Sequence, residues 1–340
     1  MLAVSLEFLA LAAVVALAGT FLARSADQIA EITRLGRLLI GSVLLAGATS
    51  LPELTVDISA VRQGMPDLAV GDLFGSSLMN LVILAALDLA HRSPGKMLSR
   101  EAAAHALSAI LSIALTAIAT MAILTAPRLP GFSFLGIGIW SWGILVAYLL
   151  GIRMIFLDQR VTARSVADAH AAMDPVDNGH GNLTPLWRPA VIFLVSAVVL
   201  FLTGPRLAHA AGQLAELSGL GKTFVGTTLV AICTSLPELV ASITALRMKS
   251  FDLVIGNVFG SNAFNMILFL PLDAVHPGSL FADVSPSHTV TALAVILATS
   301  VAVLGQLYHV EKRSRLVEPD AMLMLLILGG ALFLVYRLSS

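Results

Sequence analysis

Apolar runs long enough to cross a membrane recur along the 340-residue chain, and short polar connections separate them. A helix needs about 20 apolar residues to cross the hydrocarbon of a bilayer. Runs of this length predict ten transmembrane helices, at residues 2–23, 35–63, 67–90, 101–125, 131–157, 187–210, 220–248, 252–274, 287–308 and 320–337. The pattern therefore predicts an all-α polytopic membrane protein.

One polar connection is much longer than the others and divides the predicted helices into five and five. We expect a first five-helix unit at 1–157, a linker loop at 158–186 and a second five-helix unit at 187–340. Because each unit holds an odd number of helices, the second unit enters the membrane from the opposite face. Related units would then form inverted repeats, as in many secondary transporters.

Basic residues are distributed unequally between the two sides of this predicted bundle. Fifteen of the 20 lysine and arginine residues lie in or beside loops on the same predicted side of the bundle as the linker. The positive-inside rule then places the linker in the cytoplasm and both termini outside. We expect a multi-pass protein of the inner or plasma membrane.

Composition excludes several classes of protein. Hydrophobic residues make up 57% and charged residues 12%, whereas about a quarter of a soluble globular chain is charged. The net charge of −1 gives no reason to expect a nucleic-acid partner. Cys233 is the only cysteine, so an intrachain disulfide is impossible. We expect membrane lipid and cations as partners, and both a monomer and an oligomer remain open.

A 40-residue stretch occurs twice, at 41–80 and again without a gap at 226–265. Thr49–Leu54 returns letter for letter as Thr234–Leu239, and a G-x-x-F-G-S-x-x-x-N pattern follows in each copy. Each copy also places a glutamate, Glu53 or Glu238, inside an apolar segment. An ionisable side chain at membrane depth is a functional-site hypothesis by default, because burying its charge is costly.

Oxygen-bearing side chains surround both glutamates, next to prolines that interrupt their helices. Pro52 and Pro237 have no N–H to donate, so we expect a helix break at each. Carboxylate, hydroxyl and carbonyl oxygens together are typical of sites for hard cations such as Na⁺ and Ca²⁺. The sequence has no HExxH, GxSxG or repeated Cys/His cluster, so it predicts neither an enzyme nor a bound cofactor.

The doubled T-S-L-P-E and G-[DN]-x-x-G-S motifs resemble those of the sodium/calcium exchangers of the calcium/cation antiporter superfamily. The resemblance implies exchange of Ca²⁺ for Na⁺ by alternating access. It implies four central ligands at Glu53, Asn80, Glu238 and Asn265. It also implies flanking oxygens from the hydroxyls of Thr49, Ser50, Ser76, Thr234, Ser235 and Ser261 and from the backbone near Ala46 and Ala231.

One central position departs from the pattern of that family. The second motif of the family normally ends in aspartate, where this chain has Asn265, so the centre has two carboxylates instead of three. Asp57 and Asp72 are candidates to restore a carboxylate, and the residues equivalent to them in the second copy are Ser242 and Asn257. Fewer carboxylates also leave open a proton-coupled exchanger, or exchange of other cations, on the same fold.

Overall fold

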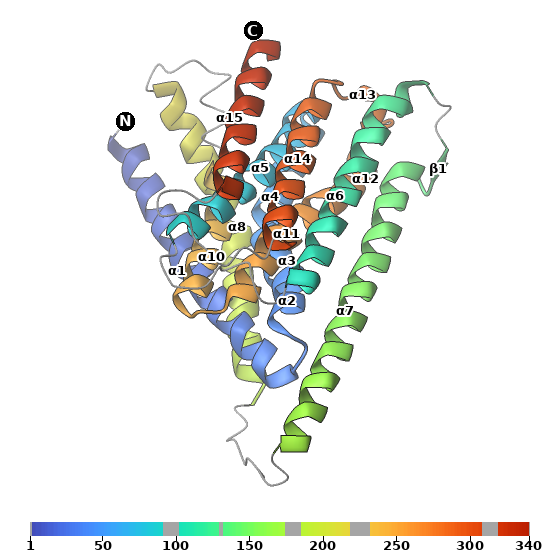
Figure 1. The fold of residues 1–340 in the computed structure, drawn as a ribbon. Coiled ribbons are helices and arrows are strands. Elements are labelled where there is room, and N and C mark those ends of the chain that lie inside the picture. The colour runs from blue at the N-terminus through green and yellow to red at the C-terminus, as the bar shows by residue number, and fades with distance from the viewer. Residues whose placement is uncertain are drawn as a thin grey trace.

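The computed structural model describes residues 2–90, 102–128, 132–173, 185–217, 232–307 and 319–339, and this part of the chain is almost entirely helical (Figure 1). The first half contains α1 (Leu2–Thr33), α2 (Arg37–Ile40), a π-helical turn (Gly41–Leu45), α3 (Ala46–Thr49), α4 (Leu51–Arg62), α5 (Pro66–Ala90), α6 (Ala102–Thr125), a 3₁₀ turn (Ala126–Arg128), a hairpin of β1 (Ser133–Phe134) and β2 (Ile137–Gly138), and α7 (Ile139–Met173). The second half contains α8 (Trp187–Leu217), α10 (Leu236–Arg247), α11 (Phe251–Ile267), α12 (Phe269–Val275), α13 (Leu280–Asp283), α14 (His288–Leu307) and α15 (Pro319–Ser339).

Seven stretches of the described chain are long and apolar enough to cross a membrane, and a bent helix pair makes an eighth. These stretches are α1, α5, α6, α8, α14, the first part of α7 and the α11–α12 segment, and the pair joins Arg37–Thr49 to Leu51–Arg62. The prediction of an apolar, helical membrane protein is therefore confirmed. Of the predicted helix 220–248, residues 220–231 lie outside the described residues, and the rest contains α10.

Both predicted ends of the fifth helix, 131–157, differ from the observed ends of α7. Residues 133–138 form the β-hairpin instead of the start of a helix, and α7 begins only at Ile139. Its helix then continues through the expected start of the linker to Met173. An apolar run marks where a helix crosses the membrane, but helical hydrogen bonding can continue into water, so hydropathy placed this end too early. Residues 174–184 of the linker lie outside the described part.

Both repeated segments contain a helix break, and it falls at a serine two residues before the proline. Ser50 has φ −84° and ψ 8°, and Ser235 has φ −81° and ψ 3°. Pro52 and Pro237 are each the second residue of the helix that follows, where a missing N–H costs little. The first break bends its helix pair by 44°. The expected breaks are thus present, displaced from the prolines to the serines.

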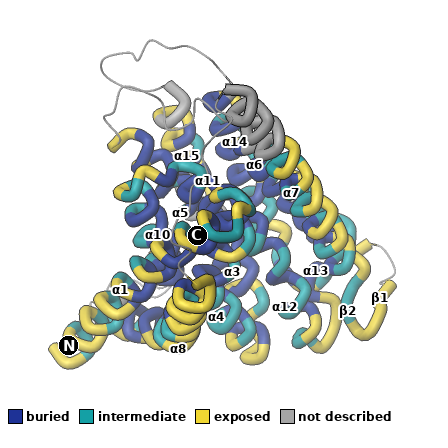
Figure 2. Tube along the Cα trace, turned by 90° about the horizontal axis from the view of Figure 1, so that it is seen from below, coloured by how far each residue is buried: buried dark blue, intermediate teal, exposed yellow. Residues whose placement is uncertain are grey.

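Helix α11 forms the centre of the described bundle, and it contacts the α2–α3 segment, α5, α6 and α10. Two glycines allow this contact. A Cβ on Gly256 would lie 2.6 Å from the carbonyl oxygen of Leu38, and one on Gly260 would lie 2.6 Å from that of Ser42. Small residues let membrane helices approach closely in this way. Figure 2 shows buried residues around this centre and exposed residues along the outer sides of α1, α7 and α8.

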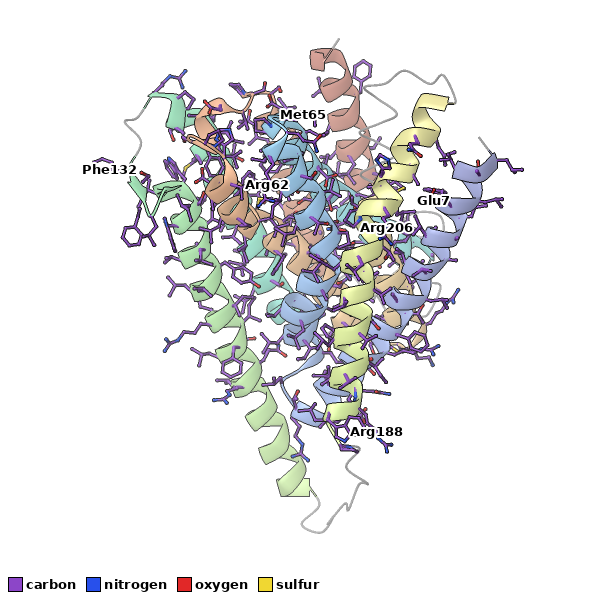
Figure 3. The ribbon with its side chains drawn as sticks, turned by 180° about the vertical axis from the view of Figure 1, so that it is seen from behind. Glu7, Arg62, Met65, Phe132, Arg188 and Arg206 are labelled. Atoms are coloured by element: carbon purple, nitrogen blue, oxygen red, sulfur yellow. The ribbon has the colours of Figure 1, made fainter. Side chains whose placement is uncertain are left out.

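The ends of the helices divide between two opposite ends of the bundle. The N-terminal end of α1 and the C-terminal end of α15 lie at the same end of the bundle, whereas α7 ends and α8 begins at the other end (Figure 1). Figure 3 shows the same division, with Arg188 at one end and Met65 at the other. The segment that joins the two halves therefore leaves the bundle far from both termini.

Candidate functional site

The two repeated segments meet inside the bundle, and each places its glutamate there. Glu53 follows the break at Ser50, Glu238 follows the break at Ser235, and none of these four residues is more than 1% exposed. Helices α5 and α11 supply the polar side chains that face the breaks. The predicted hydroxyl and amide residues that the structure describes are therefore buried inside the bundle, on the elements around the two breaks.

Hydrogen bonds cross between the two copies at this centre. The Ser50 hydroxyl of the first copy donates to Oε1 of Glu238 in the second copy, at 3.4 Å. Ser76 Oγ lies 3.2 Å from Glu53 Oε1 and 3.2 Å from Ser235 Oγ, so it joins the copies from the other side. Neither copy forms the site by itself.

Threonine side chains extend the same cross-copy contacts outward. The hydroxyl of Thr49 lies 3.4 Å from Ser261 Oγ and 3.5 Å from Oδ1 of Asn257. The hydroxyl of Thr234, at the position equivalent to Thr49, pairs with Asp72, which is equivalent to Asn257. The six predicted hydroxyls therefore fall into three hydrogen-bonded groups: Thr49, Ser50 and Ser261 around Asn257 and Glu238, Ser76 and Ser235 beside Glu53, and Thr234 at Asp72.

Each of the four predicted central residues has one buried oxygen without a hydrogen-bond partner. These atoms are Glu53 Oε2, Glu238 Oε2, Asn80 Oδ1 and Asn265 Oδ1. The amide nitrogens are occupied, since Asn80 donates to Asn262 Oδ1 at 3.0 Å and Asn265 donates to Ser77 Oγ at 3.4 Å. Ionised carboxylates and amide oxygens only accept hydrogen bonds, so each of these four buried atoms is available to a donor or to a cation.

Two residues that orient the amides were not among the predicted ligands. Asn262 accepts the hydrogen bond from Asn80 and donates to the backbone oxygen of Ser77 at 3.2 Å, while Ser77 Oγ accepts from Asn265. Ser77 and Asn262 occupy equivalent positions of the two copies. The repeat alignment shows that both are polar, but only the packing of α5 against α11 shows that each supports an amide of the opposite copy.

The backbone near Ala46 differs from the expectation. Its carbonyl oxygen accepts the Ser50 N–H at 3.0 Å and the Thr49 hydroxyl at 3.1 Å, so it is not a free ligand. The helix continues up to Thr49, and this carbonyl therefore still has the normal partner four residues later. Pro52 instead deprives the carbonyl of Ala48 of its partner. Ala231 lies outside the described residues.

Asp57 lies one helical turn after Glu53 on α4, and Asp72 lies about two turns before Asn80 on α5. Asp57 is 1% exposed and Asp72 is 8% exposed, and their carboxyl groups face each other. The equivalent residues of the second copy, Ser242 and Asn257, are uncharged. Asn257 Nδ2 donates to Ser242 Oγ at 3.1 Å. The two halves of the site therefore differ by two acidic side chains.

Among the described residues, no buried lysine or arginine balances the charge of these carboxylates. Nor do three His, Cys, Asp or Glu residues of that part converge closely enough to hold a metal by themselves. A cation at this centre would therefore bind through amide and hydroxyl oxygens as well as carboxylates, which suits hard cations.

A helical membrane bundle with buried carboxylates at two repeated helix breaks belongs to the class of secondary cation transporters. The model of the family described as "Sodium/calcium exchanger protein" matches residues 4–154 and 188–337. The chain belongs to this family. It is a membrane cation antiporter and not an enzyme.

Individual relatives resemble the chain over most of its length. The sodium/calcium exchanger MaX1 of Methanosarcina acetivorans is 28% identical over 293 residues, covering 81% of this chain and 84% of that protein. The inner membrane protein YrbG of Escherichia coli is 28% identical over 248 residues, covering 72% and 71%. A solved structure of the sodium-calcium exchanger NCX_Mj has a TM-score of 0.70 at 19% identity and covers 98% of this chain and 99% of that one. At this identity the structural match shows a shared fold.

Proposed function

We propose that this antiporter exchanges Ca²⁺ for Na⁺ at the centre formed by Glu53, Asn80, Glu238 and Asn265. The observation that carries the proposal is the free oxygen that each of these four buried side chains directs away from its hydrogen bonds. Two carboxylates balance one Ca²⁺ or two Na⁺. Because the same oxygens serve either ion, occupation by one excludes the other, and this competition couples the two fluxes.

The names of relatives support this choice of ions. MaX1 is named a sodium/calcium exchanger, and NCX_Mj was solved after soaks with Na⁺, Ca²⁺ or Sr²⁺. The hydroxyls of Thr49, Ser50, Ser76, Thr234, Ser235 and Ser261 complete the ligand set in the proposal. The proposal includes no cofactor besides the transported ions. Because one chain supplies every proposed ligand, a single chain can form the whole pathway.

We also propose that the chain crosses the membrane ten times, as two inverted five-helix repeats joined by a cytoplasmic linker. The turn between α4 and α5 lies near Ser285 and His288, which both contact Asp67. The equivalent turn between α10 and α11 lies near Asp27 at the far part of α1, through Ser250 at 2.8 Å. Equivalent turns at opposite ends of the bundle are what inversion requires.

Transport by reconstituted protein tests the proposal. Purified protein in liposomes should take up radioactive Ca²⁺ when an outward Na⁺ gradient is imposed, because Na⁺ that leaves the site frees it for Ca²⁺. A matched outward proton gradient without Na⁺ should drive no uptake above empty liposomes. Uptake driven only by protons would contradict Na⁺ coupling and favour the proton-coupled alternative. Absence of uptake under both gradients would contradict Ca²⁺ as the transported ion.

A further inference from the structure

The acidic pair Asp57–Asp72 is a second feature of the centre that the four central ligands leave unused. Both carboxyl oxygens of Asp57 and Oδ2 of Asp72 are buried and have no hydrogen-bond donor. On the other side of the pair, the Thr234 hydroxyl reaches Asp72. The two carboxyl groups lie within hydrogen-bond reach of each other, and no other side chain donates to these three oxygens, so only a shared proton or a cation can satisfy the pair.

The second copy shows how the same place is built when no ligand is required. There, Ser242 and Asn257 form a direct hydrogen bond at 3.1 Å, and Asn257 also contacts Thr49. Donor and acceptor satisfy each other, so the neutral pair is complete by itself. In the first copy, Asp57 and Asp72 replace both members with acceptors, and the pair is complete only when something positive lies between them.

A cation satisfies this pair better than a shared proton. One proton between the two carboxyl groups forms a single hydrogen bond and leaves at least one of the three buried oxygens without a partner. A cation contacts several oxygens at once. Four carboxylates also interact here, since Asp57, Asp72 and Glu238 all repel Glu53, while no buried lysine or arginine balances them among the described residues. Neutralising Glu53 and Glu238 alone leaves two charges in low dielectric.

We infer that Asp57 and Asp72, with the Thr234 hydroxyl at their edge, form an additional binding site for a sodium-sized monovalent cation in the first copy only. The inference rests on the proposed exchange function and extends it from the central site to a second one. Ca²⁺ takes six to eight oxygen ligands, and two carboxylates and one hydroxyl offer fewer. The site therefore suits Na⁺, which neutralises one of the two additional charges, and its carboxylates make up for the charge that is missing at Asn265.

Equilibrium binding of radioactive Na⁺ to the purified full-length protein, in the absence of Ca²⁺, tests the inference. The variant D57S/D72N gives the first copy the neutral pair of the second copy, and it should bind one Na⁺ fewer per chain than the unchanged protein. The Ser112→Ala variant removes another buried, unpartnered hydroxyl on α6 and should keep the full number. An equal number of bound Na⁺ in D57S/D72N and the unchanged protein would overturn the inference.

Two further measurements keep the result interpretable. If D57S/D72N aggregates, the isosteric Asp72→Asn variant should weaken one class of Na⁺ site at least tenfold, and an unchanged binding curve would overturn the inference. In E53Q/E238Q, one bound Na⁺ should persist and should be lost when D57S/D72N is added. Absence of Na⁺-driven Ca²⁺ uptake by the unchanged protein would count against the proposed function, whereas the Na⁺ count tests the additional site.

Discussion

At the residue scale, the proposed site depends on the direction of a few polar atoms. Asn80 and Asn265 each use their amide nitrogen in a hydrogen bond between α5 and α11, which directs the carbonyl oxygen away from its partner. Ser50 and Ser76 each occupy only one oxygen of a glutamate. The hydrogen bonds therefore set the oxygens that remain available for a cation.

Asn265 provides a direct test of this arrangement. Asn265→Asp adds a third carboxylate where an uncharged oxygen now faces the centre, so the variant should bind Ca²⁺ more tightly. We expect about tenfold, which corresponds to about 1.4 kcal/mol. Calorimetric titration of the purified protein with Ca²⁺ measures the change. Unchanged or weaker binding would mean that Asn265 does not contact the ion.

At the element scale, close packing brings α1 and α8 against the broken helices of the opposite halves. Gly19 of α1 faces Val240 and the carbonyl oxygen of Pro237 in α10, and Gly204 of α8 faces Pro52 of α4. The two glycines occupy equivalent positions of the two halves. Because they lie beside the residues that precede each glutamate, the position of α1 and α8 affects the shape of the site.

A larger side chain at Gly204 should therefore disturb both stability and transport. A Cβ at this position would lie 2.6 Å from Pro52 Cγ, and overpacking of this kind costs about 1–3 kcal/mol. Gly204→Val should lower the melting temperature in detergent and slow Na⁺-driven Ca²⁺ uptake. Gly212→Val, on the same helix with open space around the glycine, serves as the control. Equal effects of the two variants would contradict the proposed role of this contact.

Much of this organisation could be predicted from the sequence, and the reason is periodicity. Apolar runs located the helices, and the repeat singled out Glu53 and Glu238. Contacts between distant segments could not be predicted, because no local pattern shows that Asn262 supports Asn80 or that Gly260 lies against Ser42. The extension of α7 to Met173 was also missed, since hydropathy records where a helix leaves the membrane and not where it ends.

At the scale of the whole molecule, two related halves share one site through contacts that cross between them. Ser50 contacts Glu238, and α1 and α8 each pack against a helix of the other half. A relative movement of the halves would change these contacts together. We expect such a movement to open the centre to each side of the membrane in turn, as inverted repeats allow.

The proposed inversion predicts on which side of the membrane equivalent residues lie. Arg62 and Arg247 occupy equivalent positions, and both are exposed. In a Cys233→Ala background, R62C should react with a membrane-impermeant maleimide added outside intact cells, because it lies on the side of the termini. R247C should react only after permeabilisation. Labelling of both from one side would contradict inverted repeats.

We propose that Glu53 and Glu238 together bind the transported cation. The most direct measurement is Na⁺-driven uptake of radioactive Ca²⁺ by liposomes that contain Glu53→Gln or Glu238→Gln, compared with Ser112→Ala and with the unchanged protein. Each glutamine keeps the size of the side chain and removes its charge. We predict uptake at the level of empty liposomes for both glutamine variants, with monodisperse protein, and normal uptake for the control. Normal uptake by either glutamine variant would contradict the claim.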